Sequence, residues 1–333
     1  MKTYNVAIVG ATGVVGQEVL KVIEERNFPF KELRLLASEH SAGKKLKCCK
    51  REIEVEELTR KSFKDIDLAF FSAGGKVSKK FAPIAVKAGA IVIDKSSVFR
   101  MDNHVPLIVP EVNPEDVFKH QGIISNPNCS TIQLVVALKP IYDLVGINRL
   151  IVSTYQAVSG SGKAAVWELE DQTKQILNNK KIMRKVYPHQ IALNLLPHID
   201  EFENNDYTFE EMKLIHETKK ILGDDNLKIT ATAVRVPVKT GHSESVYLET
   251  NNYLEIKKLK QIYLDTPGIK LVDDVSNYKY PMPIMSEVYD DVMVGRLRKD
   301  LAVKNGINMW IVANNLRKGA ALNSVQIAEL LIK

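Results

Sequence analysis

Residues 5–16 of this chain read NVAIVGATGVVG, a β-branched apolar run that leads into three glycines. From Glu18 onward, apolar residues recur at helical spacing. A buried strand, a tight glycine turn and a helix, in that order, let backbone amides approach a pyrophosphate at the helix N-terminus. The spacing of Gly10, Gly13 and Gly16 is GxxGxxG rather than GxGxxG, so a glycine-rich turn without a ligand is the alternative interpretation of this stretch alone.

The alternation of strand and helix continues after this loop. Further strands are expected at residues 33–37, 67–71 and 90–93. A helix is expected at residues 77–88, ended by Gly89, and a second glycine-rich loop (SAGG, 72–75) follows a strand at the edge where such sheets bind cofactors. Right-handed βαβ crossovers and a parallel sheet follow from this order. We therefore predict an α/β, doubly wound, Rossmann-type dinucleotide-binding domain over residues 1–128.

The second half of the chain has a different pattern. Strand-like runs lie at residues 150–155, 229–236 and 243–249, separated by helices at about 164–178 and 209–222. This order predicts an α+β domain with a largely antiparallel, mixed sheet over residues 129–315. The amphipathic segment 321–332 is expected to return to the first domain, which residues 316–333 would complete. Residues 168–171 (ELED) are interpreted as a solvated helix face.

Composition narrows the class of protein. The 333 residues are 45% hydrophobic and 26% charged, which is typical of a globular protein with room for two cores. The net charge of +6 comes from scattered lysines, which favours a small anionic substrate over nucleic acid. Three cysteines make no disulfide framework and indicate a reducing compartment. Without a signal-peptide pattern or a membrane-length apolar run, we predict a cytoplasmic protein with no membrane partner, and no metal-ligand spacing is visible.

The sequence ASEHSAGKK, after the second predicted strand, lies where Rossmann-type domains distinguish NAD from NADP. The hydroxyls of Ser38 and Ser41, the imidazole of His40 and the following lysines suit a 2′-phosphate. Glu39 argues the other way, because a carboxylate suits free ribose hydroxyls. The balance of these groups favours NADP.

A cysteine lies where the first predicted domain ends. Residues 125–133 read SNPNCSTIQ, and an apolar helical run follows them. A helix N-terminus stabilises a thiolate through its dipole and its free amides. Asn128 and Ser130 can orient an oxyanion beside the cysteine. Because a lone cysteine before a helix is most often a small buried residue, the hypothesis that Cys129 is a nucleophile depends on other groups.

Those other groups come from later in the chain. Gln156 follows a predicted strand, in a loop expected to face the same crevice. Arg235 and His242 lie seven residues apart across a turn that contains Pro and Gly, and they supply a guanidinium for a carboxylate and a base for a thiol. Glu210 and Lys213 share one helix face and can hold an amino and an anionic group. Together these groups favour a nucleophilic cysteine.

Several short motifs carry a resemblance to a known family. They are GATGVVG at 10–16, SAGK at 41–44, FSAGG at 71–75, PNCST at 127–131, YQAVSG at 155–160, EEMK at 210–213, RVPV at 235–238, HSES at 242–245, VGRLR at 294–298 and KGAALN at 318–323. With these motifs the chain resembles bacterial aspartate-semialdehyde dehydrogenases from end to end. It departs from them at His40, where many relatives have Arg, and at Asn314, where Asp commonly precedes Asn315.

The resemblance implies a reaction and a setting for it. The implied reaction is the NADPH-dependent reductive dephosphorylation of 4-phospho-L-aspartate to L-aspartate 4-semialdehyde, through a thioester on Cys129. The implied setting is the biosynthesis of lysine and diaminopimelate, threonine, methionine and isoleucine. The resemblance further implies a homodimer built on the second domain, which is then both catalytic and a dimerisation domain.

The resemblance also implies roles for single residues. The catalytic groups would be Cys129 as nucleophile, His242 as general acid and base, Gln156 as orienter of the acyl intermediate and Asn128 in the oxyanion hole. The substrate contacts would be Arg235 for the α-carboxylate, Glu210 for the α-ammonium, Arg100 and Lys213 for the phosphate, and Gln156. The cofactor contacts would be Gly10, Thr12, Gly13, Val14, Val15, Ser38, His40, Ser41, Ser72, Gly74, Ser159, Gly160 and Asn315.

Two other functions would explain part of this pattern. An N-acetyl-glutamyl-phosphate reductase uses the same cysteine and histidine logic, but its substrate has no free α-ammonium that would need Glu210. A catalytically inactive Rossmann protein, acting as a binding or regulatory subunit, would be expected to lack Cys129 or His242. Both residues are present.

Overall fold

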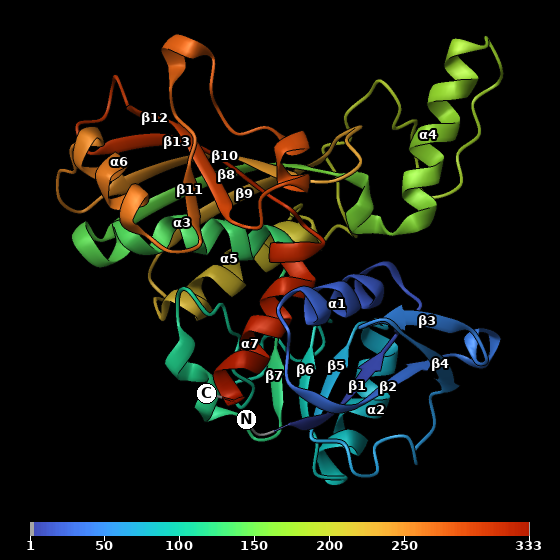
Figure 1. The fold of residues 1–333 in the computed structure, drawn as a ribbon. Helices are drawn as coiled ribbons and strands as arrows, with labels where there is room; N and C mark the ends of the chain where they lie inside the picture. The colour runs from blue at the N-terminus through green and yellow to red at the C-terminus, as the bar shows by residue number, and fades with distance from the viewer. Residues whose placement is uncertain (1–2, 333) are drawn as a thin grey trace. The chain divides into compact units, whose positions relative to one another are not determined.

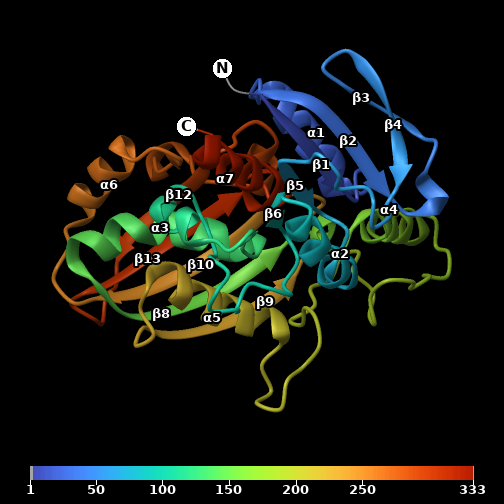
Figure 2. The same cartoon turned by 90° about the horizontal axis from the view of Figure 1, so that it is seen from below.

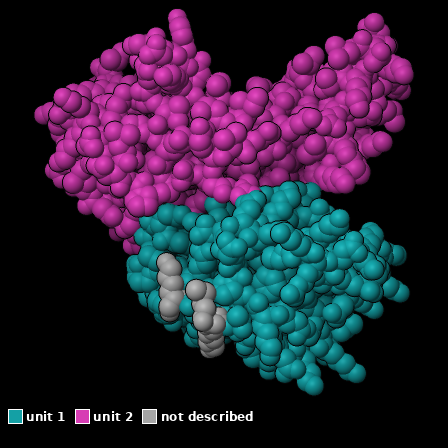
Figure 3. Space-filling model, viewed as in Figure 1, with its two compact units in different colours: residues 1–128, 320–333 teal, residues 129–319 magenta. Residues whose placement is uncertain are grey.

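The computed structural model describes residues 3–332 and divides into two compact units, which Figure 3 colours separately. Unit 1 comprises residues 1–128 and 320–333, and unit 2 comprises residues 129–319. Unit 1 is therefore built from both ends of the chain. No helix among the described residues is long and apolar enough to cross a membrane.

Unit 1 contains a seven-stranded sheet in the order β3-β4-β2-β1-β5-β6-β7 (Figure 1). Its strands are β1 (Tyr4–Val9), β2 (Phe30–Ala37), β3 (Lys45–Cys48), β4 (Arg51–Glu57), β5 (Leu68–Phe71), β6 (Ile91–Asp94) and β7 (Ile123–Ser125). Neighbouring strands are parallel except in the β3–β4 pair. Without β3, the order is the 3-2-1-4-5-6 order of a Rossmann sheet, so the doubly wound fold is confirmed.

The β3–β4 hairpin is an addition that the sequence did not predict. Its two turn residues, Cys49 and Lys50, both have positive φ angles, of 51° and 62°. Such a turn usually shows itself as Asn-Gly or Asp-Gly, and here Cys and Lys occupy it. The strands do alternate apolar and charged residues, as in KLKC and EIEVE, but they are short and no turn signal joins them.

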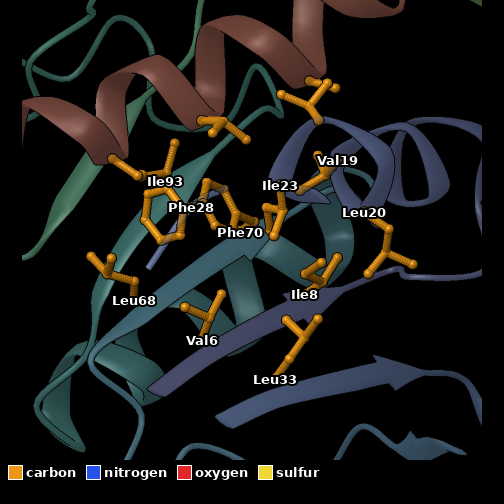
Figure 4. Close-up of a cluster of buried hydrophobic side chains, with 14 of the residues drawn as sticks. Val6, Ile8, Val19, Leu20, Ile23, Phe28, Leu33, Leu68, Phe70 and Ile93 are labelled. Atoms are coloured by element: carbon orange, nitrogen blue, oxygen red, sulfur yellow. The ribbon is translucent and has the colours of Figure 1, made fainter. Parts of the chain in front are cut away.

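The two faces of this sheet carry separate apolar cores. The α-helices that cover them are α1 (Val14–Glu25), α2 (Gly75–Lys87) and α7 (Leu322–Ile332). Val6 and Ile8 of β1 point to the side of α1 and α7 (Figure 4), whereas Ala7 and Val9 point to the side of α2. This alternation follows from the period of two along a strand. It explains why β1 is apolar at every position from 6 to 9.

Polar contacts also hold the C-terminal helix in unit 1. The Asn323 side-chain amide donates to Asn126 Oδ1 at 2.9 Å and to the Ile108 carbonyl at 3.0 Å. Ser324 Oγ donates to Asn126 Oδ1 at 3.2 Å. All of these residues are buried, so each bond replaces one that water would otherwise make. The helix thus fixes the backbone just before Asn128.

Unit 2 contains a six-stranded sheet in the order β11-β12-β13-β10-β8-β9. Its strands are β8 (Ile147–Gln156), β9 (Lys228–Arg235), β10 (His242–Thr250), β11 (Ile269–Leu271), β12 (Val292–Lys299) and β13 (Gly306–Ala313). Three of the five strand pairs are antiparallel, which confirms a largely antiparallel, mixed sheet. Against this sheet pack α3 (Cys129–Val145), α5 (Phe209–Leu222) and α6 (Ile256–Asp265), as Figure 2 shows.

Helix α4 (Lys163–Leu177) extends away from that sheet in Figure 1. The prediction of a solvated face at residues 168–171 is wrong for Glu168, whose side chain is buried. Its carboxylate accepts bonds from the backbone N–H groups of Lys185 (2.8 Å), Val186 and Tyr187 (3.4 Å). The long segment after α4 folds back over this carboxylate, and its free amides need an acceptor.

Candidate active site

Cys129 is the first residue of α3 and is partly exposed. Gly319 lies directly against it, because a Cβ built on Gly319 would be 2.8 Å from Cys129 Cβ. The backbone N–H of Gly319 donates to the Asn314 carbonyl at 2.9 Å, one residue after the end of β13. The nucleophile candidate is therefore held between a helix N-terminus and a segment that has room only for glycine.

His242 is the first residue of β10 and is completely buried. Its Nδ1 accepts a hydrogen bond from the Ala157 backbone N–H at 3.0 Å. Burial, which is the larger cause, and the charge of Arg235 lower the pKa of His242 to about 3, against the opposing effect of Glu210. The ring is therefore neutral near pH 7, and because Nδ1 is an acceptor, the single ring proton lies on Nε2. Nε2 has no hydrogen-bond partner in residues 3–332, so it is available as a donor.

Arg235 and Gln156 are neighbours at the ends of two parallel strands. They are Cα partners at the last positions of β9 and β8. The Arg235 guanidinium donates to the Ala157 carbonyl at 2.9 Å, so Ala157 contacts Arg235 through its carbonyl and His242 through its N–H. Gly160 lies over the same pair: a Cβ there would be 3.1 Å from Arg235 Nη1 and 3.4 Å from His242 Nε2.

Gln156 also contacts a buried ion pair. Its amide donates to Glu210 Oε1 at 2.9 Å, and the second Glu210 oxygen lies 3.1 Å from Lys213 Nζ. Lys213 also pairs with Asp200 at 2.8 Å. Burial lowers the pKa of Lys213, but the two carboxylates outweigh it and the net pKa is raised. A charged lysine beside a buried carboxylate suits a substrate that carries one positively and one negatively charged group.

Unit 2 thus brings Gln156, Glu210, Lys213, Arg235 and His242 to one end of its sheet. The position of the cysteine follows from the strand register: Ala313 pairs with His242, and the segment that leaves Ala313 returns at Gly319 to contact Cys129. These residues were predicted from the sequence, but the contacts of Gly319 and of the two backbone groups of Ala157 were not. No local signal identifies either, because both act through contacts between distant segments.

The glycine loop of unit 1 forms a close-packed cradle at the start of α1. Gly10 has a φ of 84°, and a Cβ there would be 2.9 Å from the Ser72 backbone. A Cβ on Gly16 would be 2.2 Å from the Gly10 carbonyl oxygen. Gly13 caps α1 without any side-chain bond, so the first amides of the helix, at Val14 and Val15, are left for a ligand. This loop fits a pyrophosphate.

Other predicted cofactor residues of unit 1 lie at the ends of neighbouring strands. Thr12 Oγ1 is 3.4 Å from Ser41 Oγ, which joins the glycine loop to the short helical turn after β2. Ser38 precedes that turn, and His40 within it is exposed. Gly74, with a φ of 85°, precedes α2. The Ser41 hydroxyl therefore lies beside the glycine loop, and Ser38 and His40 belong to the same short turn.

The remaining predicted cofactor residues belong to unit 2. The Ser159 hydroxyl and the Asn315 side chain exchange hydrogen bonds, and Asn315 Oδ1 also accepts from the Gly241 N–H at 2.9 Å. Asn315 therefore ties the loop after β8 to the residue before His242. The adjacent Asn314 donates to the Ser286 carbonyl at 2.9 Å, which an Asp at that position could not do.

Two predicted residues of unit 1 complete the set. Arg100 is buried, and its guanidinium donates to the Lys95 carbonyl at 2.7 Å. Asn128 is buried and is the last residue before Cys129. Among residues 3–332 no three metal-ligating side chains form a cluster.

Comparison with known proteins identifies the family. Residues 5–120 match the family model described as semialdehyde dehydrogenase, NAD binding domain, and residues 138–318 match semialdehyde dehydrogenase, dimerisation domain. The aspartate-semialdehyde dehydrogenase of Aquifex aeolicus is 56% identical, over 99% of this chain and 98% of that one. The chain belongs to the aspartate-semialdehyde dehydrogenase family. It is accordingly an oxidoreductase with an NAD(P)-binding domain.

Solved structures of the aspartate-semialdehyde dehydrogenase family have the same fold. The Vibrio cholerae enzyme II, described as complexed with ASA, matches with a TM-score of 0.97 at 47% identity, over 100% of this chain and 99% of that one. The Candida albicans enzyme, described as a structure with NADP, matches with a TM-score of 0.76 at 27% identity, over 99% of both chains.

Proposed function

We propose that this chain catalyses the NADPH-dependent reductive dephosphorylation of 4-phospho-L-aspartate to L-aspartate 4-semialdehyde, through a thioester on Cys129. The observation that carries the proposal is the set of Gln156, Glu210, Arg235 and His242 at the sheet end that also holds Cys129. The ASA complex of the Vibrio cholerae relative supports the substrate.

Substrate recognition is assigned to the charged groups of this set. Arg235 presents a planar guanidinium that suits the α-carboxylate, and Glu210 suits the α-ammonium. Gln156 is fixed by Glu210, so it can orient the acyl group. Lys213 and Arg100 are assigned to the phosphate. An N-acetylated substrate has no free α-ammonium for Glu210 to bind, which favours the free amino acid over an N-acetyl-glutamyl substrate.

The covalent steps begin at the nucleophile. The N-terminus of α3 favours the Cys129 thiolate, which attacks the acyl carbon and expels inorganic phosphate to leave a thioester. When bound, NADPH supplies the hydride that reduces this thioester. His242 Nε2–H donates to the substrate oxygen as negative charge develops there, with Asn128 assigned to the same oxyanion. When the intermediate collapses to the aldehyde, the Cys129 thiolate is regenerated and any proton given to the substrate oxygen returns to His242 Nε2.

The glycine cradle of unit 1 carries the proposal for the cofactor. Gly10 and Gly16 let the loop pack closely on its own backbone and on Ser72, and the amides of Val14 and Val15 at the start of α1 suit a pyrophosphate. Ser38, His40 and Ser41, at the end of β2, are assigned to the 2′-phosphate, and Ser72, Gly74, Ser159, Gly160 and Asn315 to the rest of NADP. The NADP structure of the Candida albicans relative supports this choice.

Assembly and cellular role extend the proposal. Residues 1–128 with the C-terminal helix are assigned to the cofactor, and the rest of the chain to catalysis and to a homodimer. The match of residues 138–318 to a dimerisation domain supports this division. The product would enter lysine, diaminopimelate, threonine, methionine and isoleucine biosynthesis in the cytoplasm.

The proposal is tested by phosphate-dependent NADPH formation from L-aspartate 4-semialdehyde, repeated with NAD. The wild-type chain should be active, with NADP as the better cofactor. The Cys129→Ser variant should bind NADP as tightly as the wild type by titration calorimetry and lose activity by a factor of about 10³ or more, because serine is the weaker nucleophile. Wild-type rates in this variant would exclude the thioester.

A further inference from the structure

A buried carboxyl group lies beside the candidate site but has no part in the chemistry described above. Glu244 is two residues after His242 on β10, so both side chains point to the same face of the sheet. Glu244 is fully buried, and neither carboxyl oxygen has a partner in hydrogen-bond geometry within residues 3–332. Burial raises its pKa well above the ordinary value, opposed only by Gln133. Burial therefore favours the protonated, neutral form of Glu244.

Gln133, the side chain that opposes the pKa shift of Glu244, belongs to the helix of the nucleophile. Gln133 is four residues after Cys129 on α3, which places the two side chains on one face of that helix. Gln133 is almost fully buried, and its amide atoms also lack a partner in full hydrogen-bond geometry. Thr154, opposite Glu244 in the β8–β10 register, adds a third buried and unpartnered group. The first turns of α3 thus contact β10 through polar groups.

Polar groups are a costly way to join a helix to a sheet. A buried polar side chain without ideal partners destabilises the fold, and apolar residues of similar volume often raise its stability. Most of the other α3 residues that pack on the sheet are apolar, such as Leu134 and Leu138. Unlike apolar contacts, a carboxyl–amide contact has a preferred direction and so can select one rotation of the helix.

We propose that Glu244 is a positioning residue for Cys129, which acts through Gln133 to fix the first turns of α3 against the strand that carries His242. In its protonated form the Glu244 carboxyl offers one donor and further acceptor sites to the Gln133 amide. The effect on turnover rests on the proposed function. The effect on the thiol itself does not, because it can be measured without substrate.

The test compares Glu244→Leu with Glu244→Gln in the full-length protein. Leu removes the polar contact at similar volume, whereas Gln keeps a neutral donor and acceptor. We expect Glu244→Leu to lower kcat about tenfold or more with KM within about twofold, since a small displacement of a nucleophile costs a large factor in rate. Its melting temperature should be equal or higher. Glu244→Gln should retain kcat within about threefold.

A second measurement follows the thiol directly. The rate of Cys129 alkylation by iodoacetamide, located by peptide mass spectrometry, should fall at least about threefold in Glu244→Leu and not in Glu244→Gln. Gln133→Leu should reproduce both effects, and it probes the same contact if Glu244→Leu fails to fold. The double variant should be no worse than either single variant, because both remove one interaction.

A matched control is Thr218→Val on α5, which removes another buried and unpartnered polar atom of unit 2. It should change neither kcat nor alkylation. Wild-type kcat and wild-type alkylation in both Leu variants would overturn the inference, as would effects that simply add in the double variant. If instead the wild-type chain shows no phosphate-dependent activity, the proposed function fails, and the alkylation rates still decide the role of Glu244.

Discussion

The proton of His242 is placed by a backbone group rather than by another side chain. The Ala157 N–H occupies Nδ1, so Nε2 keeps the proton and can only donate while the ring is neutral. The sequence could identify His242 as a candidate base. It could not predict the tautomer, because that depends on a backbone N–H from a loop 85 residues away.

The low pKa of His242 should make the stability of the protein depend on pH. The pKa of His242 is about 3 in the folded chain, against 6.5 ordinarily. Between these values the unfolded chain binds a proton that the folded chain does not, so the free energy of unfolding falls as the pH is lowered from about 6.5. His242→Gln should make this fall shallower, measured by urea unfolding at about pH 7.5 and about pH 5. The exposed His189, replaced by Gln, is the control, and an unchanged slope in His242→Gln would contradict the prediction.

A second prediction at the residue scale is that Gly319→Ala lowers activity. A Cβ at this position would be 2.8 Å from Cys129 Cβ, so Gly319→Ala must displace the nucleophile or its own segment. We expect kcat to fall by about tenfold or more in the NADPH assay. Gly223→Ala is the contrasting variant, because a Cβ there meets nothing but the φ of 67° is strained. It should lose about 1 kcal/mol of stability and keep its kcat. Equal kcat in the two variants would contradict this argument.

At the level of elements, we predict that Glu168 keeps the segment 185–187 ordered. Its carboxylate accepts three backbone bonds from residues 185–187, so Glu168→Ala should free that segment at a cost of about 1–3 kcal/mol. Hydrogen exchange of the amides of Lys185 and Val186 should become faster. Glu170→Ala, which removes only an exposed pair with Lys239, is the control on the same helix. Unchanged exchange in Glu168→Ala would rule out this role.

Elements with strong local signals were predictable from the sequence. Helix α5 has Thr208 as a full capping box at its start and Gly223 at its end, and its predicted range of 209–222 matches the structure. The β3–β4 hairpin alternates apolar and charged residues, with Leu46 and Cys48 on β3 and Ile53 and Val55 on β4, but it lacks a recognisable turn. The short β11 has three residues, and its pairing partner β12 is distant in sequence. Such strands are defined by their neighbours, which a local pattern does not contain.

At the scale of the whole molecule, unit 1 depends on its C-terminal segment. Helix α7 adds Leu322, Val325 and Ile327 to the core over β1, and its loss would also remove the Asn323 bonds to Asn126. Each buried apolar side chain contributes about 1.5–3 kcal/mol, against a total stability of about 5–15 kcal/mol. A chain that stops after Gly319 should therefore not bind NADP, measured by titration calorimetry.

The control for this truncation is Gln326→Ala, which removes one partly buried bond to Glu111 from the same helix. It should bind NADP almost as the wild type does. A truncated chain with wild-type affinity for NADP would show that α7 is dispensable for unit 1.

The interrupted layout of unit 1 also sets an order of events during translation. Residues 1–128 leave the ribosome first, yet α7, one of the two helices that cover the Val6 and Ile8 face of their sheet, is encoded after all of unit 2. At about 5–20 residues per second, this face waits roughly 10–40 s for its cover. Unit 2 is contiguous and can fold within that interval. During this time the α1 face of the nascent nucleotide domain lacks the apolar side chains of α7, so demand for chaperones should fall on the N-terminal third of the chain.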